Sequence, residues 1–284
     1  MRSSRPDSVQ EPEPPGGEDQ ERQRHPGRGP GPLFIVSLGP GSPDYLAPKA
    51  RQALHAARVI AGYSTYISFL EQEILEGKEV ISTGMTQEVD RCREAIARAR
   101  SGLATAVVCS GDCGIYAMAG LVLEMLEEQD LLEKIRVEII PGIPALAAGS
   151  ALLGAPLMHD FACISLSDLL TPWEVIEQRL AAASRADFVL VLYNPRSKKR
   201  DWQLDRALAI IRGDRPPGTP VGVVRNAARE DERSWATTLD EIRTGEVDML
   251  CTLFVGNSQT RLAGGRMVTP RGYGAKYDLK KTVG

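Results

Sequence analysis

From Leu33 onward, short β-branched and apolar runs alternate with longer stretches that have a helical period. Such short runs predict buried strands. Strands that alternate with helices give βαβ units, which build a mostly parallel sheet. The first five predicted strands are residues 33–38, 57–62, 79–82, 104–110 and 136–142.

A second series of predicted strands follows, and its later members have little helical sequence between them, which predicts a mixed sheet. The segment PGIPALAAGSALLGAP separates the two series. We therefore predict two α/β domains, at residues 33–144 and 145–275, followed by a tail at 276–284. The second series comprises residues 162–167, 187–195, 220–226, 234–239 and 249–257.

Composition narrows the class of protein further. Residues 1–32 are dense in Pro, Gly, Glu and Arg and almost free of apolar residues, which predicts a disordered tail. The chain has 34 Lys and Arg against 37 Asp and Glu, a balance that argues against a nucleic-acid partner. No apolar run is long enough to span a membrane. The five scattered cysteines favour a reducing cytoplasm, no disulfide framework and no metal site.

Three glycine-bearing turns follow predicted strands, where open α/β sheets bind their ligands. LGPGSPDYL has two glycines of a dinucleotide motif, but Asp44 occupies the third position, where a carboxylate would repel a pyrophosphate. SGDCGIYAMAG leads from a strand into an apolar helix, and its Asp112 is either a cap of that helix or a ligand contact. FVGNSQTR, taken by itself, is a turn without a ligand.

These turns, with IIPGIPALAAGSALLGAP, ISLSDLLTPWEVIEQRL and VLYNPRSKKR, resemble the tetrapyrrole (corrin/porphyrin) methylase family, in particular its precorrin-3B C-17 methyltransferase branch. The resemblance implies a homodimer of two-domain α/β chains with S-adenosylmethionine in the cleft between the domains. It also implies methylation of precorrin-3B, or its cobalt counterpart, at C-17. This step is coupled to ring contraction and gives precorrin-4 in cobalamin biosynthesis.

The resemblance also implies the positions that contact the cofactor. Two residues depart from the family pattern: Cys113 replaces a common Pro, and Pro144 replaces a common Ser or Thr, so a hydroxyl contact at 144 is lost. Backbone groups then have to supply the contact at that position. The implied cofactor-binding residues are Pro40, Ser110, Gly111, Asp112, Ile115, Pro144, Ala145, Asn194 and Ala227.

A precorrin carries many acetate and propionate groups, so its site needs local positive charge. Basic residues that follow strands are the predicted carboxylate partners, although Lys198 to Arg200 would instead be solvated if a helix starts there. Arg225 lies closest to a strand end. The predicted substrate-binding residues are Arg196, Lys198 and Arg225, and Lys199, Arg200 and Arg229 share their setting.

Ring contraction requires proton transfer, and His159 and Asp168 are the predicted catalytic residues. Each has a plain alternative, as a turn or packing residue for His159 and as a helix cap or turn for Asp168. Two other functions also fit the sequence. One is a family methylase that acts on another precorrin carbon, on RNA or on protein, and the other is a non-catalytic nucleotide-sensing α/β protein.

Overall fold

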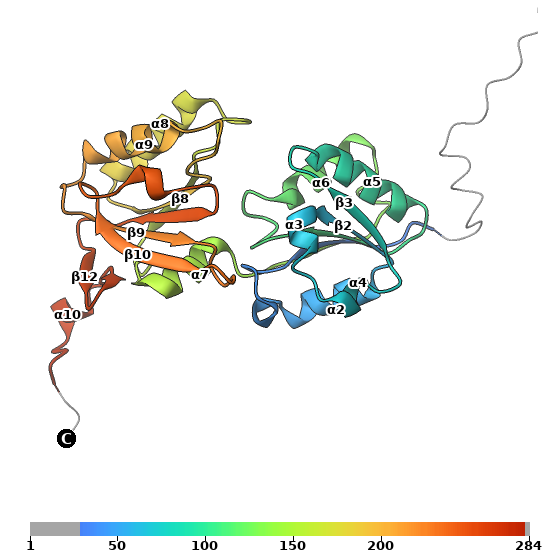
Figure 1. The fold of residues 1–284 in the computed structure, drawn as a ribbon, viewed down its shortest axis with the longest axis horizontal. Helices are drawn as coiled ribbons and strands as arrows, with labels where there is room; N and C mark the ends of the chain where they lie inside the picture. Colours follow the sequence, from blue (N-terminus) through green and yellow to red (C-terminus); the bar gives the residue numbers. More distant parts are fainter. Residues whose placement is uncertain (1–28, 282–284) are drawn as a thin grey trace, which may run out of the picture.

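The computed structural model describes residues 29–281, which form two lobes placed end to end (Figure 1). Residues 1–28 of the predicted disordered tail, and the last three residues of the chain, lie outside the described part. Just before the first strand the chain is already bonded to the first lobe. The Gly31 N–H donates to the Ala99 carbonyl at 2.8 Å, and the Pro32 carbonyl accepts from the Thr105 N–H at 2.9 Å.

The first lobe is a parallel sheet with helices on both faces. Its strands are β1 (Leu33–Ser37), β2 (Val59–Tyr63), β3 (Glu79–Thr83), β4 (Thr105–Cys109) and β5 (Val137–Ile140). They lie in the order β3-β2-β4-β1-β5, and every neighbouring pair is parallel. The predicted parallel sheet is confirmed, and the carboxyl ends of all five strands therefore share one edge.

The helices of the first lobe are α2 (Pro48–Ala56), α3 (Ser64–Ile67), α4 (Gln72–Leu75), α5 (Glu88–Arg100) and α6 (Met118–Glu128), with the 3-10 turn η1 (Pro43–Tyr45). Helices α5 and α6 cover one face of the sheet and α2 and α4 the other (Figure 1). Helix α6 begins later than its apolar sequence predicts, because the preceding residues form a turn in which Tyr116 has a φ of 51°.

The second lobe contains β7 (Phe161–Ser165), β8 (Val189–Tyr193), β9 (Pro220–Arg225), β10 (Arg233–Thr238) and β11 (Cys251–Val255) in the order β10-β9-β11-β8-β7. Only β7 and β8 pair in parallel, which confirms the predicted mixed sheet. Because β8 and β9 are both antiparallel to β11, strands β7, β8 and β9 run in the same direction. Their carboxyl ends share one edge of the second sheet.

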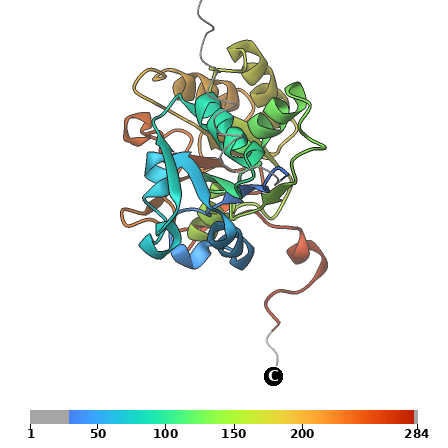
Figure 2. The same ribbon diagram turned by 90° about the vertical axis from the view of Figure 1, so that its right-hand side faces the viewer.

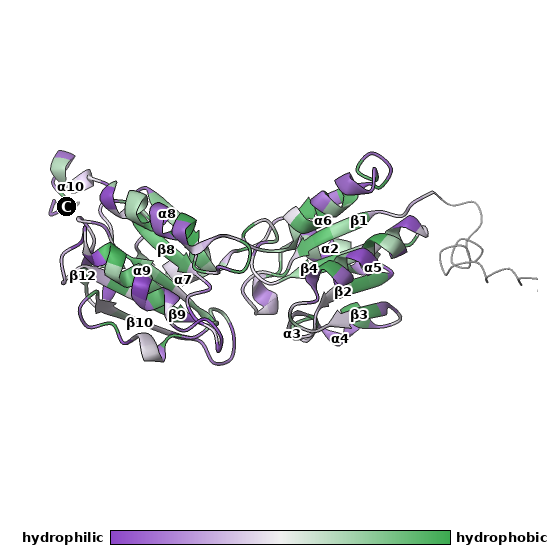
Figure 3. Cartoon of the chain, turned by 90° about the horizontal axis from the view of Figure 1, so that it is seen from above, coloured by the Kyte–Doolittle hydropathy of each residue, from purple (hydrophilic) through white to green (hydrophobic). Residues whose placement is uncertain are grey.

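Helices sandwich the second sheet as well, and its strands form an apolar layer between them (Figure 3). Helices α8 (Trp173–Arg185) and α9 (Gln203–Arg212) pack on one face, and α7 (Ala145–Leu153) packs on the other. The 3-10 turn η2 (Thr244–Glu246) precedes β11. All ten predicted strands are present.

A small third sheet of β6 (Gly154–Ala155), β12 (Arg261–Ala263) and β13 (Arg266–Val268) was not predicted, because strands of two or three residues carry no period. Helix α10 (Tyr273–Lys276) stands away from both lobes (Figure 2). No helix within residues 29–281 is long and apolar enough to cross a membrane.

Candidate active site between the lobes

The first two glycine-bearing turns are bonded to each other. They follow the neighbouring strands β1 and β4, and Gly39 and Gly111 exchange two backbone hydrogen bonds of 3.1 and 2.6 Å. Both glycines have positive φ, 72° and 69°, a conformation that is strained for residues with a side chain. The two glycine turns therefore lie side by side at the carboxyl edge of the first sheet.

Asp112 joins this pair of loops to a third. Its carboxylate accepts from the Gly114 N–H at 2.8 Å, in its own turn, and from the Gly142 N–H at 2.9 Å, beyond β5. Helix α6 starts with Ala117 as its cap and receives no side-chain cap, so the helix-cap interpretation of Asp112 is wrong. The carboxylate instead holds the loops that follow β4 and β5 in one arrangement.

The second lobe presents the ends of β7, β8 and β9. The Asn194 side-chain amide donates to the Ser165 hydroxyl at 2.9 Å, which ties the ends of β7 and β8 together. Asn194, Asn226 and Ala228 all have φ between 50° and 58°. Non-glycine residues rarely adopt this conformation, and such residues concentrate at functional sites. The residues with strained backbone therefore lie at the carboxyl edge of this sheet, which is also the edge where α/β folds bind their ligands.

Two tyrosines connect the lobes. The Tyr116 hydroxyl donates to the Cys163 carbonyl at 2.9 Å, and the ring centroids of Tyr116 and Tyr193 lie 5.4 Å apart. The Tyr193 hydroxyl accepts from the Leu146 N–H at 2.8 Å, at the start of α7. Burial, its largest cause, and contacts with Cys163 raise the pKa of Tyr116 to about 12. Both hydroxyls therefore stay protonated near neutral pH.

Arg229, in the loop after β9, makes the third connection between the lobes. Its Nε donates to the Pro40 carbonyl and its Nη2 to the Ser110 hydroxyl, each at 3.0 Å, so one side chain of the second lobe holds both glycine turns of the first. Its guanidinium lies 4.7 Å from the centroid of the Phe69 ring. Burial lowers the pKa of Arg229.

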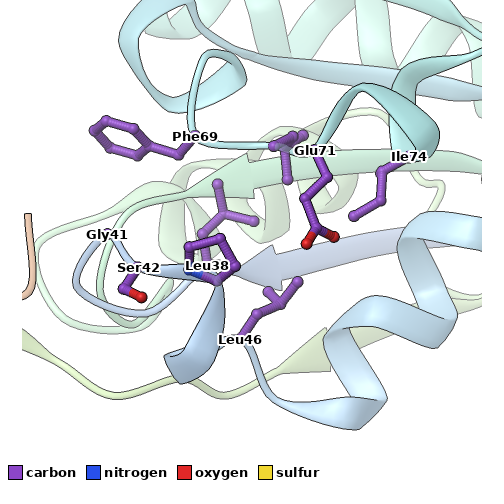
Figure 4. Close-up of a pocket in the computed structure, with 9 residues that line it drawn as sticks. Leu38, Gly41, Ser42, Leu46, Phe69, Glu71 and Ile74 are labelled. Atoms are coloured by element: carbon purple, nitrogen blue, oxygen red, sulfur yellow. The ribbon is translucent and has the colours of Figure 1, made fainter.

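An apolar hollow lies beside the first glycine turn (Figure 4). Its lining includes Gly41, Leu46, Phe69 and Ile74, and the one charged side chain in the lining, Glu71, is ion-paired with Arg51. The hollow shares Gly41 and Phe69 with the surroundings of Arg229. It therefore borders the region between the lobes.

The predicted cofactor-binding residues come from the loops at the two edges described above, except Ala145, which is the first residue of α7. A Cβ built on Gly111 would lie 3.8 Å from both the Pro144 Cα and the Ala145 backbone nitrogen, so these three residues are neighbours. Ala227 packs on the same apolar cluster as Tyr193. The structure thus brings together segments that are more than 180 residues apart, as the Arg229–Pro40 bond shows.

The predicted substrate-binding residues have unequal settings. Arg225 is bonded to Asp231 at 2.6 Å and to Asp248 at 3.0 Å, which raises its pKa and leaves its charge already compensated. Arg196 donates to the Thr244 carbonyl at 3.0 Å. Lys198 is exposed at the carboxyl edge of the second sheet. Of the three, Lys198 is the most accessible to an anionic ligand.

Arg200, which shares the loop with Lys198, is buried and donates to the carbonyls of Leu166 and Asn194 at 3.2 and 2.9 Å. It therefore joins the loops that follow β7 and β8. The helix start considered for this segment is wrong, because α9 begins only at Gln203; Lys198 and Lys199 are exposed to solvent, but Arg200 is not.

The two predicted catalytic residues lie at opposite ends of β7. His159 precedes the strand, is exposed, and accepts a hydrogen bond from the Asp160 N–H at 2.9 Å. Asp168 follows the strand and accepts from the Gln203 side-chain amide at 3.0 Å. Only Asp168 is at the edge that carries Asn194 and Ser165. The structure therefore does not bring His159 and Asp168 together.

Three aromatic residues at the junction of the lobes are absent from the site predicted from the sequence. Tyr116 is two residues beyond the second glycine of its turn, Tyr193 is next to Asn194, and Phe69 has no neighbouring motif at all. The tyrosines could have been found as aromatic residues directly beside the glycine and asparagine motifs. Phe69 could not, because only the three-dimensional arrangement places it against Arg229.

Comparison with known sequences shows the family to which the chain belongs. Residues 32–243 match the model of the Tetrapyrrole (Corrin/Porphyrin) Methylases. The "Probable cobalt-factor III C(17)-methyltransferase" of Salmonella typhimurium is 48% identical over 241 residues, which cover 85% of this chain and 99% of that protein. The "Precorrin-3B C(17)-methyltransferase" of Sinorhizobium sp is 39% identical over 234 residues, which cover 82% of this chain and 91% of that protein.

A longer relative, the "Cobalt-factor III methyltransferase" of Priestia megaterium, is 46% identical over 254 residues; the match covers 89% of this chain and only 47% of that protein. The chain therefore spans about half the length of that relative.

The chain is also similar to solved structures of methyltransferases. The methyltransferase CobJ superposes with a TM-score of 0.81 at 37% identity, covering 84% of this chain and all of that one. A uroporphyrin-III C-methyl transferase from Thermus thermophilus, complexed with S-adenyl homocysteine, superposes with a TM-score of 0.59 at 24% identity, covering 80% and 97% of the two chains. At that identity the second likeness concerns the fold alone. The chain belongs to the tetrapyrrole methylase family.

Proposed function

We propose that this chain transfers a methyl group from S-adenosylmethionine to C-17 of precorrin-3B or of its cobalt counterpart, with contraction of the ring. The names of the relatives from Salmonella typhimurium and Sinorhizobium sp support the acceptor and the position. The observation that carries the proposal is the pair of glycine turns, bonded to each other and held by Asp112, opposite the strand ends of the second lobe.

The chemistry of these loops fits S-adenosylmethionine better than a nucleotide. A diphosphate needs backbone N–H groups at a helix N-terminus or basic side chains. Here the turn after β4 carries a carboxylate, and two of its neighbouring N–H groups already donate to that carboxylate. A negative group suits a ligand with a sulfonium and an ammonium charge. Gly111, whose Cβ position has only 3.8 Å contacts, leaves room for close approach of such a ligand.

In this proposal the cofactor supplies a methyl group activated by the adjoining sulfonium. The residues of the chain bind the cofactor and the acceptor and orient them toward each other. The glycine turns and the segment at Pro144 and Ala145 hold the cofactor through backbone groups, while Asn194 and Ala227 close it in from the second lobe. Tyr116 and Tyr193 pack against each other at the junction of the lobes, beside these residues.

For the acceptor we propose that Lys198 and Arg196 attract side-chain carboxylates at the rim of the second sheet. Arg225 is a weaker proposal, because Asp231 and Asp248 already bind it. For proton transfer we retain Asp168, which is at the edge facing the first lobe. His159 is at the other edge of the sheet and would need a separate role.

Two broader features complete the proposal. A cytoplasmic location is supported by the five unpaired cysteines, four of them buried, all of which fall in the described part of the chain. A homodimer is supported by family resemblance, and light scattering of the purified chain tests it. A single-chain mass would contradict the dimer without affecting the proposed chemistry.

The decisive experiment supplies S-adenosylmethionine with either precorrin-3B or cobalt-factor III and follows the product by mass spectrometry and absorption. We expect one added methyl group and a ring-contracted spectrum with at least one acceptor. Methylation of a different precorrin would identify another activity of the family. Binding of nucleotides without methyl transfer to any acceptor would support the nucleotide-sensing alternative instead.

A further inference from the structure

Arg229 reaches the first lobe through a space that only a glycine leaves open. A Cβ built on Gly41 would lie 2.5 Å from the Arg229 Cγ and 3.1 Å from its Nε. The side chain passes over Gly41, and its guanidinium then lies on the Phe69 ring and between the two glycine turns. Its position is therefore set by the fold of both lobes.

Three hydrogen bonds occupy three of the N–H groups of this guanidinium. A guanidinium has five N–H groups, of which Nε–H and one Nη2–H form one fork and one Nη1–H and the other Nη2–H form the second, end-on fork. The first fork is filled by the Pro40 carbonyl and the Ser110 hydroxyl. One of the two Nη1–H groups donates to Asn226 Oδ1 at 3.3 Å. Within residues 29–281 one Nη1–H and one Nη2–H therefore have no bonded acceptor.

In the part of the chain that the structure describes, no carboxylate oxygen lies within 4.0 Å of the Arg229 nitrogens, and Asp231 acts on the Arg229 charge only from a longer distance. Two of the three acidic residues that follow it in sequence have other partners. Asp231 binds Arg225 and Asn226, and Glu232 accepts from the Ala228 N–H at 2.6 Å. Burial lowers the pKa of Arg229, but a guanidinium remains charged at neutral pH.

A half-buried cation with an open bidentate fork and no counter-ion is the arrangement that a carboxylate fills best. We propose that the end-on fork of Arg229 is a carboxylate subsite between the lobes, occupied when ligand binds. This inference rests on the proposed function, which offers two sources of a carboxylate. One is the methionine part of the cofactor, and the other is an acetate or propionate of the tetrapyrrole.

The experiment compares the Arg229→Gln and Arg229→Lys variants with the unaltered full chain. Calorimetry measures the affinity of S-adenosylhomocysteine and of methylthioadenosine, which lacks the carboxylate, and turnover gives KM and kcat for the tetrapyrrole acceptor. If the cofactor supplies the carboxylate, Arg229→Gln weakens S-adenosylhomocysteine about 10- to 100-fold and spares methylthioadenosine. If the acceptor supplies it, KM for the acceptor rises by a similar factor while both nucleoside affinities are kept.

Arg229→Lys keeps the charge and loses the fork, so we expect it to recover only part of the lost affinity. Arg185→Gln, at the exposed end of α8, is the matched control and should behave as the unaltered chain. The proposal is overturned if both Arg229 variants keep S-adenosylhomocysteine affinity and acceptor KM within about twofold. It is also overturned if methylthioadenosine weakens as much as S-adenosylhomocysteine, because Arg229 would then only join the lobes. An unaltered chain that binds no cofactor and methylates no acceptor would instead refute the proposed function and this subsite with it.

Discussion

At the scale of single residues, Asp112 holds loops together in the structure and is proposed to contact the cofactor as a second role. Its carboxylate accepts hydrogen bonds from the Gly114 and Gly142 N–H groups. We expect Asp112→Ala to lower the free energy of unfolding by about 1–3 kcal/mol in ligand-free denaturant titrations, because two N–H groups lose a charged acceptor. Asp112→Asn, which keeps one acceptor oxygen, should cost less.

Asp44→Ala is the matched control, since Asp44 is exposed in the other glycine turn, where its carboxylate accepts from the Ser42 hydroxyl. It should change stability by less than about 0.5 kcal/mol. Calorimetry with S-adenosylhomocysteine then tests the second role of Asp112. Unchanged affinity in Asp112→Ala would limit Asp112 to holding the loops, and unchanged stability would show that the two hydrogen bonds contribute nothing.

The positions of the two predicted catalytic residues make a second prediction. Asp168→Asn should reduce kcat for ring contraction by about 10²- to 10⁴-fold, the range expected for loss of a proton-transfer group. His159→Gln should leave kcat within about twofold, because His159 is exposed at the edge of the sheet away from the cofactor-binding residues. The reverse ranking in steady-state assays would return proton transfer to His159.

At the scale of elements, helix α7 depends on the absence of a side chain at Gly149. A Cβ there would lie 2.9 Å from two ring atoms of the fully buried Phe254. Gly149→Ala should therefore lower the free energy of unfolding by about 1–2 kcal/mol, since overpacking outweighs the gain in helix propensity.

Gly120, in α6, provides the contrast, because a Cβ there meets nothing within 4 Å and the position is exposed. Gly120→Ala should raise the free energy of unfolding by about 0.5–1 kcal/mol. Denaturant midpoints of the two variants should thus move in opposite directions. A stabilising Gly149→Ala would mean that α7 shifts freely over the second sheet.

The elements also show how far the sequence predicts the structure. Buried apolar runs such as Leu33–Ser37 predict their strands because burial on both faces requires continuous β-branched and apolar residues. The late start of α6 was missed, since a left-handed Tyr116 is a property of tertiary contacts and not of local propensity. The third sheet was missed because its strands are too short to have a pattern.

The candidate site was predictable where glycine and asparagine follow strands, because strand ends of a parallel sheet meet at one edge. The partners of the basic residues were not predictable. Arg225 ends β9 and Arg229 lies four positions later in the following loop, yet one is bound to two carboxylates and the other to neutral acceptors of the opposite lobe. Which of two nearby cations is free depends on contacts that span the whole molecule.

At the scale of the whole molecule, several ion-paired carboxyl groups make the free energy of unfolding depend on pH in the acid range. Lys49, Arg206 and Arg225 hold the pKa values of Glu138, Glu177 and Asp231 below their ordinary range. A lowered folded-state pKa gives stability that is complete above the unfolded value, about 4, and is lost as pH falls through the folded value. We expect denaturant midpoints to be flat from pH 6 to 8 with respect to these groups and to fall below about pH 4.

Glu177→Gln should make that acid-induced decline shallower, because its pairing with Arg206 no longer titrates. High salt should do the same in the unaltered chain, since these carboxyl groups lie near the surface and are screened. An acid decline that neither the variant nor salt changes would place its origin in other groups.

The last prediction concerns the junction of the lobes, which Tyr116, Tyr193 and Arg229 form. A cofactor that contacts both lobes would bind the folded, joined state only. S-adenosylhomocysteine at 100 times its Kd should then raise the free energy of unfolding by about 2.7 kcal/mol.

Tyr116→Ala removes the hydrogen bond to Cys163 and the contact with Tyr193. In scanning calorimetry the two lobes of this variant should therefore unfold at more separated temperatures than in the unaltered chain. Saturating S-adenosylhomocysteine should bring the two transitions of this variant together again. If it stabilises one transition and leaves the other in place, the cofactor is held by a single lobe, and the contacts proposed for Asn194 and Ala227 fail.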